Sequence, residues 1–266
     1  LAGQTGYCGQ TAELMAARAS LHYWEEPCIS GTSGSGTVFF SGCNLRCVFC
    51  QNHNIALGKA GRVIAPEHLA EIFLQLQEQG ANNINLVTPT HFLPQIVIAL
   101  EQAKQQGLHL PIVYNTGSYE SPEALRHLEG LVDIYLPDLK YFSPELSTAY
   151  SHAPDYFETA CAAISEMYRQ VGDSVIDEDT GLMQHGMIVR HLLLPGQTKD
   201  SKKILRYLHE TYGDHIYISI MNQYTPLPQV ADIEVLNRTV TPEEYDRVLR
   251  FAERIGIERC FRQEGP

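Results

Sequence analysis

Short runs of apolar, mostly β-branched residues alternate along this sequence with longer segments in which apolar residues recur every three or four positions. This alternation is typical of βα units around a parallel sheet, and it predicts an α/β architecture. The length of 266 residues fits one large domain of this kind. The predicted strands are residues 37–40, 84–87, 112–114, 132–136, 187–194 and 215–220, and the predicted helices are 67–79, 94–106, 123–128, 156–171, 201–212 and 242–255. Residues 173–184 are predicted to form an acidic surface loop.

Polar residues follow the predicted strands, at the ends where ligands bind in parallel α/β folds. Each of them, taken alone, is equally well explained as a helix cap, a turn residue or a satisfied core group. Their shared position at one rim favours a binding site. These rim residues are Thr88, Thr90, Asn115, Asp138, Lys140, Arg190 and Gln223.

Three cysteines, Cys43, Cys47 and Cys50, lie in the run SGCNLRCVFCQN, directly after the first predicted strand. Three thiolates on one loop can bind three irons of a [4Fe-4S] cluster and leave the fourth iron open to a small molecule. The alternative is a structural zinc site completed by His53, although zinc ligands usually come as two separated pairs. Three buried cysteines without a ligand are a weaker alternative, because the loop is polar. The odd total of seven cysteines argues against a disulfide framework.

The chain carries 31 acidic and 19 basic side chains, which gives a formal net charge of -12. This excess of negative charge disfavours broad binding to nucleic acid or to an anionic membrane surface. No run approaches the roughly 18 consecutive apolar residues that span a bilayer, and the N-terminal residues lack the pattern of a signal peptide. We therefore expect a cytoplasmic protein that binds neither membranes nor nucleic acid.

The cysteine run resembles the cluster loop of radical S-adenosylmethionine (SAM) enzymes, in which an aromatic residue commonly precedes the last cysteine, as Phe49 does. The longer run WEEPCISGTSGSGTVFFSGCNLRCVFCQN is similar to an uncharacterised branch related to pyruvate formate-lyase activating enzyme. The resemblance extends over most of the chain and implies an incomplete (β/α) barrel of about six parallel strands. Residues 37–266 would form this partial barrel with its C-terminal helix, and residues 1–36 an N-terminal extension packed on it.

The resemblance also implies contacts with SAM. The relatives carry Asp-x-Lys after strand four, as at Asp138 and Lys140, and an arginine shortly before Pro-Gly, as at Arg190. These charged groups suit the carboxylate, amino group and ribose of SAM, and Phe49 suits the adenine face. The remaining expected SAM contacts are Thr88, Thr90, Asn115 and Gln223.

Two departures from the pattern of the relatives are plain. The Gly-Gly-Glu motif that grips the SAM amino group is absent, and the run LVTPTH at residues 86–91 takes its place. The relatives also have a histidine at the end of strand six, where this chain has Asn222 and Gln223. The first departure removes the residues that bind the SAM amino group in the relatives.

The implied activity is reductive cleavage of SAM by a [4Fe-4S] cluster, which yields a 5′-deoxyadenosyl radical that abstracts hydrogen from a substrate. The implied partners are an external one-electron donor, such as flavodoxin or ferredoxin, and a glycyl radical enzyme that this chain would activate. The alternative is a stand-alone radical SAM enzyme acting on a small molecule or a peptide. A non-catalytic cluster or zinc protein that only binds partners is a further alternative from a different class.

Overall fold

The centre of the fold is a run of seven parallel strands in the order β2–β4–β5–β6–β8–β9–β10. The computed structural model describes residues 3–263. The parallel strands are β2 (Ser35–Phe40), β4 (Ile84–Val87), β5 (Ile112–Thr116), β6 (Ile134–Pro137), β8 (Met183–Leu192), β9 (Tyr217–Met221) and β10 (Cys260–Arg262). At the β2 edge, β1 (Met15–His22) pairs antiparallel with β2, and β3 (Arg62–Val63) pairs antiparallel with β1. Because β3 and β10 do not pair with each other among the described residues, the barrel stays open.

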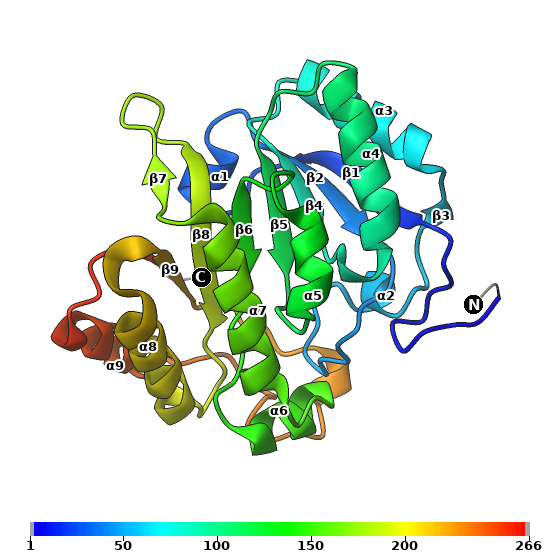
Figure 1. The fold of residues 1–266 in the computed structure, drawn as a ribbon. Coiled ribbons are helices and arrows are strands. Elements are labelled where there is room, and N and C mark those ends of the chain that lie inside the picture. The colour runs from blue at the N-terminus through cyan, green and yellow to red at the C-terminus, as the bar shows by residue number, and fades with distance from the viewer. Residues whose placement is uncertain (1–2, 264–266) are drawn as a thin grey trace.

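Helices connect the parallel strands and cover the outer face of the sheet (Figure 1). They are α3 (Pro66–Glu78), α4 (Leu93–Gln105), α5 (Pro122–Leu125), α7 (Tyr156–Val171), α8 (Thr198–Tyr212) and α9 (Pro242–Ile255). The ends follow local chemistry: α9 begins with a capping box between Thr241 and Glu244 and ends at Gly256 in the left-handed conformation. No helix within residues 3–263 is long and apolar enough to cross a membrane.

Three short helices lie at the two ends of the sheet. Helices α2 (His53–Ala56) and α6 (Pro144–Ser151) lie at the end to which the arrows of the parallel strands point in Figure 1. Helix α1 (Pro27–Ser30) and the small strand β7 (Val175–Ile176), which pairs with β8, lie at the opposite end. The carboxyl ends of the strands therefore face α2, α6 and the loops that carry them.

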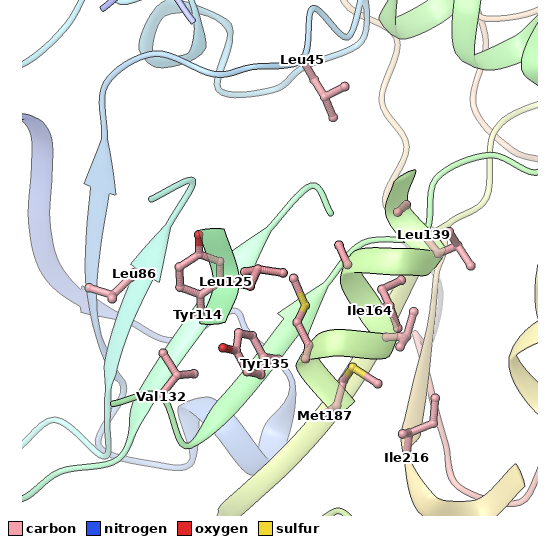
Figure 2. Packing of buried hydrophobic residues seen from close by; sticks show 14 of the residues in the cluster. Leu45, Leu86, Tyr114, Leu125, Val132, Tyr135, Leu139, Ile164, Met187 and Ile216 are labelled. Atoms are coloured by element: carbon pink, nitrogen blue, oxygen red, sulfur yellow. The ribbon is translucent and has the colours of Figure 1, made fainter. Parts of the chain in front are cut away.

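Side chains along the central strands alternate between two hydrophobic clusters, because successive residues of a strand point to opposite faces. Residues such as Tyr114, Tyr135 and Met187 belong to the large cluster on the helical side (Figure 2). Their neighbours on the concave face join a small cluster with Cys28 and Ile29 from α1. The members of this small cluster from the central strands are Val113, Ile134, Leu136, Met183 and Ile188. Helix α1 therefore closes the amino-terminal end of the concave face with apolar side chains.

The predicted incomplete parallel barrel is confirmed, and all six predicted strands are present, β4 with the predicted bounds and the other five with shifted ends. The prediction missed β10, which has only three residues, and β1, whose sequence MAARASLH contains no β-branched residue. It also missed α6, and residues 173–184 are not simply a loop, because they include β7 and the start of β8. The proposed division of the chain at residue 36 stays a prediction.

Candidate active site

The cysteine loop leaves the carboxyl end of β2 through a sharp turn at Gly42. Gly42 has a φ of 89°, and a Cβ there would lie 2.5 Å from Gln10 Cγ and 2.7 Å from the carbonyl oxygen of Cys8. Only glycine fits this conformation and this space. The backbone N–H of Cys43 donates to the same carbonyl of Cys8 at 3.3 Å, so the N-terminal segment lies directly against the loop.

The three thiols of the loop are partly buried and lie in one another's electrostatic field. Burial and, to a smaller extent, the charge of Cys47 together raise the pKa of Cys43 to about 12. Burial and the same neighbour also raise the pKa of Cys50. Thiols of this kind become thiolates when a metal centre supplies the positive charge that their surroundings lack.

The donor set fits an iron–sulfur cluster better than a single metal ion. Within residues 3–263, no group of three His, Cys, Asp or Glu side chains is arranged to hold one metal ion. A four-iron cluster needs a different arrangement, because each cysteine binds its own iron. Three sulfur donors on one loop satisfy that requirement. His53 instead begins α2.

A buried charged network lies on the concave face at the carboxyl ends of β5, β6 and β8. The Arg190 guanidinium donates to Asp138 Oδ1 at 3.0 Å, to Glu25 Oε2 at 3.1 Å and to Asn115 Oδ1 at 2.6 Å. Lys140 Nζ donates to the other oxygen of Asp138. The structure thus brings four of the predicted rim residues, Asn115, Asp138, Lys140 and Arg190, into one contiguous set.

Opposite charges keep Asp138 ionised despite its burial. Burial alone would raise the pKa of Asp138, but the positive charges of Lys140 and Arg190 hold it below its usual value. Burial would likewise lower the pKa of Lys140, but Asp138 and Cys47 raise it. The Lys140 side chain also approaches the cysteine loop, because a Cβ at Gly117 would lie 3.6 Å from Lys140 Cε and 3.0 Å from Leu45 Cδ1. A zwitterionic ligand at this position meets both signs of charge.

The end of β4 supplies a different kind of polar group. Thr88 has a φ of 56°, which is a strained conformation for a β-branched residue, and its N–H donates to the carbonyl of Asn115 at 2.9 Å. The Thr90 hydroxyl donates to Glu120 Oε1 at 3.0 Å. Glu120 also accepts hydrogen bonds from the hydroxyls of Tyr114 and Thr116. Thr90 is therefore engaged by a buried carboxyl group at the rim.

Phe49 and Gln223 lie apart from the charged network. The Phe49 ring is almost fully buried and packs edge-on against Tyr141 and Tyr224, with ring centroids 6.4 Å and 6.0 Å away. Gln223 is exposed, and its backbone carbonyl accepts a hydrogen bond from Gln51 Nε2 at 3.2 Å. Gln223 thus contacts the end of the cysteine loop through its backbone carbonyl.

Two acidic residues of this region were not among the predicted site residues. Glu25 follows Trp24 in the sequence, and no sequence pattern fixes the direction of its side chain. In the structure Glu25 reaches the concave face, where it pairs with Arg190 and accepts from Asn85 at 3.2 Å. No feature of the sequence indicates that Glu120 is a site residue.

The comparisons with known proteins agree with this geometry. A family model described as the radical SAM superfamily matches residues 37–208. The chain therefore belongs to the radical SAM superfamily, as the cysteine run predicted. The cofactors of this superfamily are a [4Fe-4S] cluster and SAM, and its enzymes catalyse radical reactions.

Two relatives extend this result. An uncharacterised protein of Methanocaldococcus jannaschii is 27% identical over 268 residues, which cover 97% of this chain and 72% of that protein. The pyruvate formate-lyase-activating enzyme of Clostridium pasteurianum is 29% identical over 121 residues, 42% of this chain and 48% of that enzyme. This second similarity is local and spans about half of the enzyme.

Solved structures show the same fold. A radical SAM methyltransferase from Sphaerobacter thermophilus superimposes with a TM-score of 0.56 at 14% identity, over 95% of this chain and 78% of that one. The structure of native anSMEcpe with bound AdoMet gives a TM-score of 0.57 at 14% identity, over 81% of this chain and 57% of that one. At this level of identity the likeness concerns the fold alone.

Proposed function

We propose that this chain binds a [4Fe-4S] cluster through Cys43, Cys47 and Cys50 and holds SAM between that cluster and the charged network. The observation that carries the proposal is the position of Lys140, which pairs with Asp138 and approaches the cysteine loop at Leu45. When bound, the cluster supplies the electron that cleaves SAM to methionine and a 5′-deoxyadenosyl radical, which abstracts hydrogen from the substrate.

The protein itself orients SAM and excludes water. Lys140 and Arg190 would bind its carboxylate and ribose oxygens, and Asp138 would accept hydrogen bonds from its ribose or its amino group. The amino group has no Gly-Gly-Glu motif to bind, and we assign it to the end of β4, where Thr88 turns the backbone. Below the network, α1 and the apolar cluster close the concave face to water.

For the substrate we propose a glycine of a partner protein, which makes this chain an activating enzyme. The support is the local similarity to the pyruvate formate-lyase-activating enzyme. The electron would come from an external donor such as flavodoxin or ferredoxin. We place the reaction in the cytoplasm, because the seven cysteines are all free thiols and a low-potential cluster needs a reducing compartment.

The test is anaerobic reconstitution with iron and sulfide, followed by paramagnetic resonance of the reduced protein with and without SAM. We expect about four irons per chain, a signal that changes on addition of SAM, and release of 5′-deoxyadenosine. Cys47→Ala should lose both the cluster signal and SAM cleavage. Cys161→Ala, on α7 and outside the loop, is the matched control and should keep both. A Cys47→Ala protein that retained cluster and turnover would refute the proposal.

A second measurement separates the substrate classes. Incubation of the reduced holoenzyme with SAM and a glycyl radical enzyme should give the doublet resonance of a glycyl radical on the partner. A SAM-dependent change in a metabolite or peptide, without any such partner, would instead identify a stand-alone enzyme.

A further inference from the structure

The last turn of α6 forms hydrogen bonds with the middle of the cysteine loop. The backbone N–H of Val48 donates to the carbonyl of Tyr150 at 2.9 Å, and that of Arg46 donates to the carbonyl of Ser151 at 3.4 Å. Between these two contacts, the Ser151 hydroxyl donates to Cys47 Sγ at 3.0 Å. Three consecutive loop residues are therefore held by two consecutive residues at the end of one helix.

A second hydroxyl supports this contact. Tyr141 Oη lies 2.7 Å from Ser151 Oγ, and both side chains are 1% exposed. Because the Ser151 hydrogen points to the sulfur, the Tyr141 hydroxyl must be the donor in its bond to Ser151. The two residues thus form a directed chain from Tyr141 through Ser151 to Cys47, in which both hydroxyl-bearing side chains are buried.

The other two thiols of the loop have different surroundings. The backbone N–H of Leu45 lies 3.4 Å from Cys43 Sγ, and this is a longer and weaker contact. In the part of the chain that the structure describes, no side-chain hydroxyl donates to the sulfur of Cys43 or Cys50. The hydroxyl chain therefore singles out one of the three cysteines.

We propose that Tyr141 and Ser151 are positioning residues that set the reduction potential of the cluster through a hydrogen bond to Cys47. The inference rests on the proposed function, because it takes Cys47 as a cluster ligand. Reduction adds negative charge that is shared by the sulfur ligands, and a hydrogen bond to a ligand sulfur stabilises the reduced form. The Tyr141 hydroxyl strengthens this bond by polarising the Ser151 hydroxyl, and the low local dielectric increases the effect.

The test compares reconstituted Ser151→Ala, Tyr141→Phe and Ser147→Ala proteins with the wild type. Ser147 is the matched control, because it lies on the same helix, is equally buried and donates only to the carbonyl of Pro144. Tyr141→Phe keeps the ring that packs on Phe49 and removes only the hydroxyl. The readouts are the midpoint potential of the cluster and the shift of its Fe–S stretching frequencies in D2O.

We expect Ser151→Ala to lower the equilibrium constant for cluster reduction about tenfold, which is a shift of about 59 mV to lower potential for a one-electron couple. Tyr141→Phe should shift the potential less, in the same direction, and Ser147→Ala should not shift it. The shift of the Fe–S stretching frequencies in D2O should become smaller in Ser151→Ala but not in Ser147→Ala. Equal potentials in Ser151→Ala and Ser147→Ala, or an unshifted Tyr141→Phe, would overturn the inference and leave the proposed function standing. A wild-type protein that binds no cluster would overturn both.

Discussion

Removal of the Arg190 guanidinium is the sharpest test of the charged network. Arg190 is 13% exposed and bonds to Glu25, Asp138 and Asn115 at once. Arg190→Met keeps most of the length of the side chain but leaves Glu25 without its cation, whereas Asp138 keeps Lys140. Breaking a buried ion pair in this way costs about 3 to 5 kcal/mol. Burial already raises the pKa of Glu25, and proton uptake by its carboxyl group limits the loss to this range.

The free energy of unfolding is best measured by urea titration followed by far-UV circular dichroism. Tryptophan fluorescence is a poor probe here, because the single tryptophan, Trp24, is 86% exposed. The matched control is Arg250→Met on α9, which removes an exposed pair with Asp246 four residues away. Exposed pairs of this kind contribute about 1 kcal/mol or less.

The double variant Glu25→Gln/Arg190→Met tests the cause of the loss. If the unpaired Glu25 carboxyl group causes most of the destabilisation, Glu25→Gln should restore part of the stability that Arg190→Met removes. We expect the double variant to be more stable than Arg190→Met alone. An Arg190→Met protein that lost no more stability than the Arg250→Met control would refute the reasoning.

Two further predictions concern Glu120 and Gly42. Burial raises the pKa of Glu120, so the native state binds this proton more tightly than the unfolded chain and loses stability as pH rises above 4.5. The wild type should therefore lose stability relative to Glu120→Gln between about pH 5 and about pH 7, so the unfolding free energy of the variant minus that of the wild type should increase. A difference that stayed constant over this range would contradict the prediction. Gly42→Ala should lose bound iron. Its control is Gly80→Ala, at a φ of 85° with open space around it, which should lose only about 1 kcal/mol of stability. The bound iron and the free energy of unfolding in urea are measured for both variants.

The parts of the fold that were predictable are those in which one residue pattern determines one element. The runs at β4, β5 and β6 are mostly apolar and are buried on both faces, as is typical of parallel strands, and glycines end the helices between them. Strand β1 was not predictable, because alanine, arginine and serine in MAARASLH form a strand only when β2 offers its edge. Tertiary pairing, not local propensity, decides the conformation of such a segment.

The predictable part of the site is likewise the part that is local in sequence. The spacing of Cys43, Cys47 and Cys50 sufficed for the loop, and the strand-end position sufficed for Asp138 and Arg190. The contact of Ser151 with Cys47 joins residues 104 positions apart, at the end of a helix that the sequence did not predict. Such a contact results from tertiary packing, and the spacing of residues in the sequence does not predict it.

Glu25 shows how the segment before β2 takes part in the electrostatics of the concave face. Its carboxylate accepts from Arg190 at 3.1 Å and is 10% exposed, so it balances one of the two positive charges of the network. With Glu25 and Asp138 ionised, the charges of Arg190 and Lys140 are neutralised within the protein. Loss of Glu25 would leave an excess positive charge beside the proposed SAM site, which would tighten the hold on a carboxylate and weaken the hold on a sulfonium. We therefore propose that Glu25 is one of the residues that decide how the proposed ligand is bound.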